Sequence, residues 1–402
     1  MKRLSLTITA LFLLTLTLSA ETIEWWQFAT DPAVKPVIEE IVTQFEQENP
    51  DITVNVTDLT WAHGHEKIVL AYSSGQAPDI VELGSDWIAQ FADAGYLEDI
   101  APYMDGDNTD LQGLSMALWK DKLYAYPWYL GTRVLYYNRH LMDSAQFPPD
   151  FVPVTDSHLK GLANSLMLLG DDIYGWGSNS PETHRLYKKW LPFLWTAKGQ
   201  ILTDDQQYCV ISSEYAVSAL KYYVNLCKIT GYVGTQRAIE DAFLDGKIGI
   251  VFSGDWLLKR IKQEKRDINF FTGLFPGLGY PGVSFMGGEF LAVSSQSANK
   301  EASMKFIKFL CSPENQIKFC KANQSANPSS KTAQKDLFFQ SDPNMKTFIQ
   351  QIQMANHPPV HPRWVEIEAI VEEAVEKAVF KDVEPADALH EAQRKIARII
   401  SE

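Results

Sequence analysis

The chain has 402 residues, of which 46% are hydrophobic and 12% aromatic, and it carries a formal net charge of −14. This length is too great for one compact core and predicts two lobes, while the composition excludes disordered and fibrous proteins. The excess of acidic side chains repels nucleic acid and anionic lipid, so we expect neither as a partner.

The amino terminus has the features of a cleaved export signal. Lys2 and Arg3 precede an apolar run over residues 4–18, and Ala20 ends a pair of small residues. The run is shorter than the roughly 20 residues that a membrane-spanning helix needs. We therefore expect residues 1–20 to be a signal peptide, with a retained signal anchor as the alternative. The mature chain would be exported, most simply to a bacterial periplasm, with 34 basic and 50 acidic residues and a net charge of −16.

Strands and helices alternate over the first hundred residues. Apolar periodicity predicts strands at 22–28, 51–59 and 79–83 and helices at 36–50, 66–78 and 87–96. This alternation predicts a parallel sheet with helices on both faces, and ligands of such sheets bind beyond the carboxyl ends of the strands. The stretch Gly84-Ser85-Asp86-Trp87 lies at one such end.

The rest of the chain predicts a second sheet and a helical carboxyl terminus. Extended segments are expected at 122–138, 247–252 and 283–295, and helices at 184–197, 213–230, 299–311, 313–322, 363–380 and 385–402. The stretch Ser253-Gly254-Asp255-Trp256 follows a strand in the same way as the earlier turn. No internal repeat or long linker separates these segments.

An indole and a carboxylate at the end of a strand suit the binding of a sugar. A pyranose presents apolar C–H faces, on which aromatic rings stack, and a rim of hydroxyls that carboxylates bind strongly. We expect Trp87 and Trp256 to stack on the sugar, and Ser85, Asp86 and Asp255 to bind its hydroxyls. The alternatives are core packing for the indoles and helix capping for the aspartates. Because both aspartates open helices, whose dipole favours a negative charge, we expect them to be ionised between about pH 5 and 8.

Five segments, taken in order, carry a resemblance to a known family. They are "APDIVELGSDW", "KLYAYPWYLGTRVLYYN", "GKIGIVFSGDW", "MGGEFLAVSSQSANKEASMKFIKFLCSPENQIKF" and "NPSSKTA". In this order they resemble the sugar-specific solute-binding proteins of bacterial ABC importers, which maltose-binding protein typifies. The resemblance covers essentially the whole mature length.

The resemblance implies an α/β fold with two lobes, each a mainly parallel sheet flanked by helices, and a ligand cleft between them. Three crossings would join the lobes, near 128–132, 284–288 and 324–329. The implied lobe one comprises residues 21–129 and 287–326, and lobe two comprises residues 130–286 and 327–402. Trp87 and Trp256 would then belong to different lobes.

Further ligand contacts are implied by the same resemblance. Trp128 and Arg133 flank the first crossing, where Gly131 replaces an acidic residue that is usual in the family. Gly288 and Glu289 follow the second crossing, and Glu289 would accept hydrogen bonds from hydroxyls. His184 takes a place where relatives carry an aromatic contact. The remaining candidates are Trp26, Gln27 and Trp364, and core packing is the alternative for the two tryptophans.

Cysteines and histidines give two open questions. Cys209–Cys227 and Cys311–Cys320 are the nearest pairs, and an exported protein permits disulfides, but four buried thiols explain the spacing equally well. His63 and His65 could chelate a metal if the backbone is extended, although no third ligand lies nearby and a solvated loop is favoured. We expect no cofactor.

The expected function is the delivery of a di- or oligosaccharide to an ABC permease by a monomeric binding protein, not an enzyme. A glycoside hydrolase is the alternative, since Asp86 and Asp255 could act as paired carboxyls. Nothing in the sequence marks either for a raised pKa, and motifs of hydrolases and phosphate-binding loops are absent from it. A binder of a polyol or a glycerol-phosphate compound is a second alternative.

Overall fold

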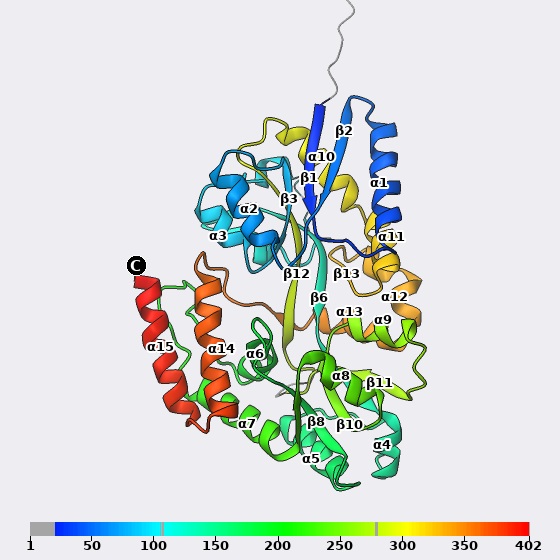
Figure 1. Ribbon diagram of the computed structural model, residues 1–402, viewed down its shortest axis with the longest axis vertical. Coiled ribbons are helices and arrows are strands. Elements are labelled where there is room, and N and C mark those ends of the chain that lie inside the picture. Colours follow the sequence, from blue (N-terminus) through cyan, green and yellow to red (C-terminus); the bar gives the residue numbers. More distant parts are fainter. Residues whose placement is uncertain (1–20, 105, 107, 278–279, 402) are drawn as a thin grey trace, which may run out of the picture.

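The computed structural model describes residues 21–104, 106, 108–277 and 280–401. The expected signal peptide, residues 1–20, lies outside the described residues. Figure 1 shows two α/β halves stacked along the long axis, with two strands passing between them. The two-lobed architecture that the sequence predicts is therefore confirmed.

The larger sheet has seven strands. In spatial order they are β13 (Asn327–Pro328), β6 (Tyr126–Thr132), β12 (Ser284–Val293), β3 (Ile80–Gly84), β1 (Glu21–Gln27) and β2 (Ile52–Asp58), with β14 (Ala355–Asn356) beside β12. The first three strands in the chain pair in parallel, as predicted. β6, β12 and β13 pair antiparallel, because the chain runs through them in opposite directions as it passes between the lobes. The sheet is therefore mixed, with parallel pairing among the strands of the first hundred residues and between β12 and the short β14.

Helices cover the larger sheet in the upper half of Figure 1. They are α1 (Lys35–Glu48), α2 (Gly64–Ser73), α3 (Ile88–Asp93), α10 (Lys300–Leu310) and α11 (Pro313–Asn323). The apolar stripe of α1 packs inward through Ile38, Ile41 and Phe45, and the helix ends before Pro50, which cannot continue it. All five helices occupy segments in which the sequence pattern predicts a helix.

The smaller sheet has five strands and is also half parallel. In spatial order they are β11 (Phe270–Gly273), β7 (Val134–Asn138), β10 (Ile248–Ser253), β8 (Tyr174–Asn179) and β9 (Gly231–Gly234). The helices around it are α4 (Arg139–Ser144), α5 (Asp156–Met167), α6 (Leu186–Thr196), α7 (Glu214–Thr230), α8 (Gln236–Leu244), α9 (Trp256–Gln263), α14 (Trp364–Phe380) and α15 (Pro385–Ser401). α12 (Leu337–Ser341) and α13 (Pro343–Ile352) lie beside the junction of the two halves (Figure 1). The remaining elements are the hairpin β4 (Leu118–Trp119) and β5 (Lys122–Leu123) and three short 3₁₀ helices at Ala101–Tyr103, Leu114–Ala117 and Ala333–Lys335.

The first crossing between the sheets is one residue long. β6 ends at Thr132 and β7 begins at Val134, so Arg133 joins a strand of the larger sheet to a strand of the smaller one. A β-bulge in β6 leaves Trp128 unpaired, because Glu289 pairs with Tyr129 whereas the next residue of β12 pairs with Pro127. β12 begins at Ser284 and β13 pairs with β6, while the positions of the other two crossings stay a prediction. The residue boundaries of the lobes stay a prediction.

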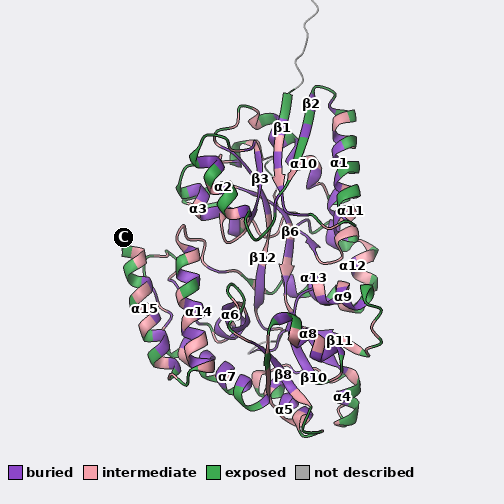
Figure 2. Ribbon diagram, viewed as in Figure 1, coloured by how far each residue is buried: buried purple, intermediate pink, exposed green. Residues whose placement is uncertain are grey.

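Two apolar cores stabilise the fold. The first fills lobe one and continues over one face of the smaller sheet to Tyr136, Leu257 and Phe348, and the second lies between the other face of that sheet and α5, α6, α7, α14 and α15. Figure 2 shows buried residues along β3, β6, β12 and β10, inside the covering helices. The four cysteines are buried free thiols, which answers the question of pairing. Among the described residues, no helix combines the length and the apolar character needed to cross a membrane.

Candidate functional site

A flat floor of glycines lies where β3, β6 and β12 run side by side between the lobes. Gly131 pairs with Gly287, and Glu289 pairs with both Tyr129 and Gly84, so these residues share one face of the sheet. A Cβ atom on Gly131 would meet nothing within 4 Å, and one on Gly84 would meet its first neighbours at 3.7 Å, the Glu289 Oε2 atom, and 3.9 Å, the Trp61 ring. A Cβ atom on Gly287 would lie 3.2 Å from the Phe285 ring, so the space there is tight. Gly84, Gly131 and Gly287 are here called the glycine floor, and the first two leave space above the sheet for a ligand.

Aromatic rings gather at the lobe-one side of the glycine floor. Trp61 stacks on Phe28 with ring centroids 4.2 Å apart and is 50% exposed. Trp87 lies beside it at 5.5 Å and also contacts the edge of His65 at 4.9 Å. Phe28, Trp61, His65 and Trp87, here called the aromatic cluster, thus keep an indole surface open to a ligand face.

Two carboxyls, the buried Glu82 and the half-buried Glu289, lie at the lobe-one end of the glycine floor. Glu82 is completely buried and accepts hydrogen bonds from the Phe28 amide at 2.6 Å and, weakly, from the Tyr129 hydroxyl at 3.4 Å. Burial raises the pKa of Glu82 to about 8. Burial, together with the neighbouring Glu82 carboxyl, raises the pKa of Glu289 well above its usual range. The Glu289 Oε2 atom is buried without a hydrogen-bond partner among the described residues, and its contact with a ligand hydroxyl stays a prediction.

Arg133 lies at the opposite end of the glycine floor, between two aromatic rings. Its Cζ atom is 4.4 Å from the ring centroid of Phe285 and 5.5 Å from that of Trp256. Burial lowers the pKa of Arg133 to about 10, against a weaker opposing effect of Tyr187. The Trp256 indole is held in turn by a hydrogen bond from its Nε1 to Glu240 at 2.7 Å. These groups belong to the lobe-two side of the site.

Ion pairs between the two lobes flank the glycine floor. Lys188 on α6 contacts Asp86 at 3.1 Å, and Lys259 on α9 contacts Asp31 at 2.5 Å. Neither pair is fully exposed, because the side-chain exposures are 15% and 22% for the first pair and 15% and 34% for the second. Asp86 therefore reaches the other lobe, and Ser85 lies beside it with its hydroxyl about 3.5 Å from the Asp86 carboxylate.

Asp255 does not face the site as the sequence predicts. The residue is 1% exposed, and its Oδ2 atom accepts a hydrogen bond from Asn327 at 2.7 Å. Burial raises its pKa to about 7, although the bond from Asn327 opposes this shift. The expectation that Asp255 is ionised throughout pH 5 to 8 is therefore wrong, because desolvation outweighs the position at the start of a helix.

Three other candidates have no surface that a ligand could reach in this structure. Trp128 is 0% exposed and packs on Trp25 and Phe319, and Trp364 is 1% exposed with its Nε1 bonded to Glu368. Gln27 is 1% exposed, and its amide is used by Asp58 and by the Ala29 backbone. These predictions are wrong for one physical reason, because each side chain points into the interior of a lobe. The position of a residue at the end of a strand or the start of a helix does not reveal this direction.

The last three candidates have structural surroundings of their own. Trp26 is half-buried, with the Lys67 ammonium 4.6 Å from its ring on the side that α2 covers. A Cβ atom on Gly288 would lie 2.6 Å from the Tyr129 carbonyl oxygen, so glycine permits β6 and β12 to approach. His184 has φ of +65°, is bonded through Nδ1 to Glu368, and that bond raises its pKa. The structure thus does not bring these residues onto the glycine floor.

Helix α14 contacts the start of α6, the helix that carries Lys188. The Glu372 carboxylate accepts hydrogen bonds from the backbone amides of His184, Arg185 and Leu186 at 2.8, 3.1 and 2.9 Å. These amides lie at the start of α6 and have no partner within that helix, so Glu372 caps α6 from a distant helix. The cap fixes the helix that carries Lys188.

The metal alternative finds no support. His65 is bonded through Nε2 to Gln90 at 3.0 Å and packs against aromatic rings. No group of three or more metal-ligating side chains occurs in residues 21–104, 106, 108–277 and 280–401.

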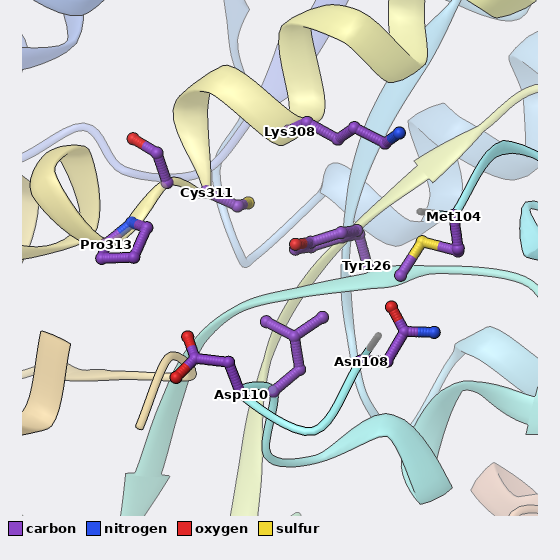
Figure 3. Close-up of a pocket in the computed structure, with 9 residues that line it drawn as sticks. Met104, Asn108, Asp110, Tyr126, Lys308, Cys311 and Pro313 are labelled. Atoms are coloured by element: carbon purple, nitrogen blue, oxygen red, sulfur yellow. The ribbon is translucent and has the colours of Figure 1, made fainter. Parts of the chain in front are cut away.

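Two cavities lie outside the glycine floor. The smaller, of about 250 Å³, is in lobe one, where Figure 3 shows Asp110, Tyr126, Lys308 and Cys311 around it. The larger, of about 340 Å³, lies beside the loop that precedes α14 and is lined by Trp195 and His357. Neither includes a residue of the glycine floor or the aromatic cluster.

Comparison with known proteins identifies the family. Residues 40–347 match the family of bacterial extracellular solute-binding proteins. The chain belongs to this family. It is 26% identical over 384 residues to a protein of Brucella abortus named as a binding protein, covering 91% of this chain and 90% of that one. It is 24% identical to the maltodextrin-binding protein MdxE of Bacillus subtilis, covering 84% and 81% of the two chains.

A solved structure shares the fold of this chain. The sugar-binding protein MalE of Xanthomonas citri superposes with a TM-score of 0.85 at 24% identity, covering 94% of this chain and 97% of that one. The likeness confirms the two-lobed fold of such solute-binding proteins.

Sequence reasoning missed several site residues. Glu82 could have been found, because a carboxylate inside the apolar strand "IVELG" is unusual for a buried strand. Trp61 carries the same kind of signal, since it follows β2 at a carboxyl end as Trp87 follows β3. Lys188 and Glu240 had no local signal, because their partners lie 102 and 16 residues away in the chain.

Proposed function

We propose that this protein is the substrate-binding component of an ABC importer and binds a sugar, of one to a few units, between its lobes. Family membership supports the class of protein, and the maltodextrin-binding relative supports the class of ligand. The observation that carries the proposal is the glycine floor, which has open indoles on the lobe-one side and Arg133 with Trp256 on the lobe-two side.

The ligand would drive closure by contacting both lobes. A ligand shifts a two-state equilibrium only through its different affinity for the two states, and contacts from both lobes exist together only when the lobes are close. Ser85, Asp86, Trp87 and Glu289 would bind from lobe one, and Arg133 and Trp256 from the junction and lobe two. We propose that the permease recognises the closed form, and that the protein is exported and acts as a monomer.

Binding without catalysis fits the positions of the carboxyls. A glycosidase needs an accessible acid with a raised pKa beside the scissile bond. Burial raises the pKa of Glu82 to about 8 and that of Asp255 to about 7, and both residues are at most 1% exposed, so neither could protonate a glycosidic oxygen without a rearrangement of the lobes. Burial also raises the pKa of Glu289, which lines the glycine floor, so recovery of intact sugar is the test of a catalytic role for this residue.

A thermal-shift screen with mono- and oligosaccharides tests this proposal. A ligand that binds only the folded protein raises the melting temperature. At a ligand concentration of 100 times its Kd, the free energy of unfolding increases by about 2.7 kcal/mol. We expect at least one sugar to do so, and mass spectrometry to recover it intact after long incubation. Stabilisation only by polyols or glycerol phosphates would favour those alternatives, and cleaved sugar would favour the hydrolase.

A further inference from the structure

The guanidinium of Arg133 has no direct partner in the site, and the carboxylates that act on its charge, Asp86 and Asp255, do so only through space. Its Nε atom is buried without a hydrogen-bond partner, and the side chain forms no ion pair or hydrogen bond with any of the described residues. Arg133 is half-buried and arginine cannot discharge by losing a proton at neutral pH, so a buried N–H group without an acceptor is unfavourable. The missing acceptor is therefore expected to come from a ligand.

The carboxylates nearest to Arg133 already have other partners. Asp86 is paired with Lys188, and Asp255 accepts a hydrogen bond from Asn327. Glu368 is bonded to His184, Tyr187 and Trp364. These bonds leave the lobe-two end of the glycine floor without a free carboxylate for Arg133.

Other positive groups strengthen the local field. Lys188 lies with its Nζ 5.4 Å from the Phe285 ring centroid, the ring that also contacts Arg133. Arg185, near enough to act on the pKa of Arg133, has one ion pair, a long one of 3.9 Å to Glu182. The acidic surface of the whole chain acts over longer distances, and salt screens exposed charges beyond about 10 Å. Asp86 and Asp255 partly offset these positive groups, because both also act on Arg133, so the unused N–H group of Arg133 carries the case for an anion.

The aromatic rings decide which kind of anion fits. Phe285 and Trp256 cover the guanidinium, so ligand atoms approach it best along its edges, where the N–H groups form a planar fork. A carboxylate is planar and accepts two parallel hydrogen bonds from such a fork. Glu289 lies four residues further along β12 from Phe285, roughly 13 Å at the usual rise per residue, which leaves room for hydroxyl groups at that end of the ligand.

We propose that Arg133 binds a carboxylate of the ligand, so that this protein takes up an acidic sugar: a hexuronic acid or a short oligosaccharide that contains one. This inference rests on the proposed function and adds the charge of the substrate to it. The ligand would lie on the glycine floor, with its carboxylate at Arg133 and its hydroxyls toward Glu289 and the aromatic cluster.

Calorimetric titration with matched sugars tests the inference. The probes are galacturonic acid, glucuronic acid and digalacturonic acid, each beside its methyl ester and its neutral hexose counterpart. At least one free acid should bind tenfold or more tightly than both matched neutral forms, a difference of about 1.4 kcal/mol. In Arg133→Gln that preference should fall below threefold, because the variant keeps a donor but loses the charge.

Arg139→Gln is the control for loss of an arginine stacked on an aromatic ring. Arg139 lies 4.2 Å from the Phe271 ring centroid, but its guanidinium already donates to Pro149 at 2.5 Å. This variant should keep the preference for the acid, and circular dichroism should confirm that both variants fold.

Each contrary result has a separate meaning. Neutral sugars or methyl esters that bind as tightly as the free acids would overturn the inference and leave the proposed function standing. A preference for the acid that survives in Arg133→Gln would also overturn it. If no sugar of any kind binds, the proposed function fails and this inference fails with it.

Discussion

Two turns with nearly the same residues end strands in the two lobes, yet they serve different purposes. After β3, Gly84-Ser85-Asp86-Trp87 presents Asp86 to Lys188 of the other lobe and places Trp87 in the aromatic cluster. After β10, Ser253-Gly254-Asp255-Trp256 buries Asp255 against Asn327 and bonds the Trp256 indole to Glu240. The same residue types at the end of a strand therefore give a half-buried contact to the other lobe in one case and a buried junction in the other.

The glycines differ in the same way, and the largest expected effect follows from them. A Cβ atom on Gly254 would lie 1.9 Å from the Trp256 ring, whereas one on Gly84 would have 3.7 Å of space. Gly254→Ala should lower the free energy of unfolding by about 2–3 kcal/mol, because it overpacks the turn. Gly84→Ala should change stability by less than about 0.5 kcal/mol but weaken ligand binding. Urea denaturation measures both, and equal losses of stability would show that the turns do not differ.

The two aspartates should respond differently to pH. Asp255 has a folded pKa of about 7, raised by burial above its unfolded value, so its protonated form favours the folded state. Stability from this group is present below the unfolded pKa and is lost as pH rises through about 7. The free energy of unfolding of Asp255→Asn, taken relative to that of wild type, should therefore increase by on the order of 2 kcal/mol as the pH is raised from 5 to 8.

Melting temperatures at pH 5, 6, 7 and 8 measure this effect, with Asp86→Asn as the matched control. Asp86 is paired with Lys188 at the edge of the site, so its removal should leave the pH slope unchanged. An Asp255→Asn variant with the slope of wild type would contradict the buried assignment of Asp255.

The indoles should matter for binding more than for stability. Trp87→Ala and Trp256→Ala should each weaken ligand binding at least tenfold, about 1.4 kcal/mol, because each removes a stacking surface. Trp119→Ala, a half-buried indole bonded to Asp93 outside the glycine floor, is the control and should bind normally. If the indole instead belongs to the core, its substitution should lower the free energy of unfolding by about 3–5 kcal/mol and leave the affinity unchanged. That result would show that the residue is not part of the site.

The smallest effect is expected from the ion pair between the lobes. Lys188→Gln removes the partner of Asp86, and a partly exposed pair is worth at most about 1 kcal/mol. Affinity should fall by about two- to fivefold, and the loss should shrink as salt is added. Lys228→Gln, which removes the exposed pair with Asp382, should leave affinity unchanged. A larger loss that does not depend on salt would mean that Lys188 contacts the ligand directly.

The sequence predicted elements better than contacts. Local sequence patterns are sufficient to predict β3 and β10 from their Ile- and Val-rich runs and α1 from its amphipathic pattern. The structure confirms all three elements. The site depends on pairs that are distant in the chain, such as Asp255 with Asn327, which local patterns do not specify. The direction of a side chain is the second feature that local patterns do not specify. Trp128 follows Pro127 in a β-bulge, and its ring is buried in the core of lobe one.

Small-angle X-ray scattering tests the central claim, closure of two lobes on a ligand, most directly. The ion pairs between the lobes show that the structure represents a closed arrangement. With a saturating sugar that binds, the scattering curve should match the one calculated from this structure, and without ligand the radius of gyration should be larger. An identical curve with and without saturating ligand would contradict the account, whatever the affinity.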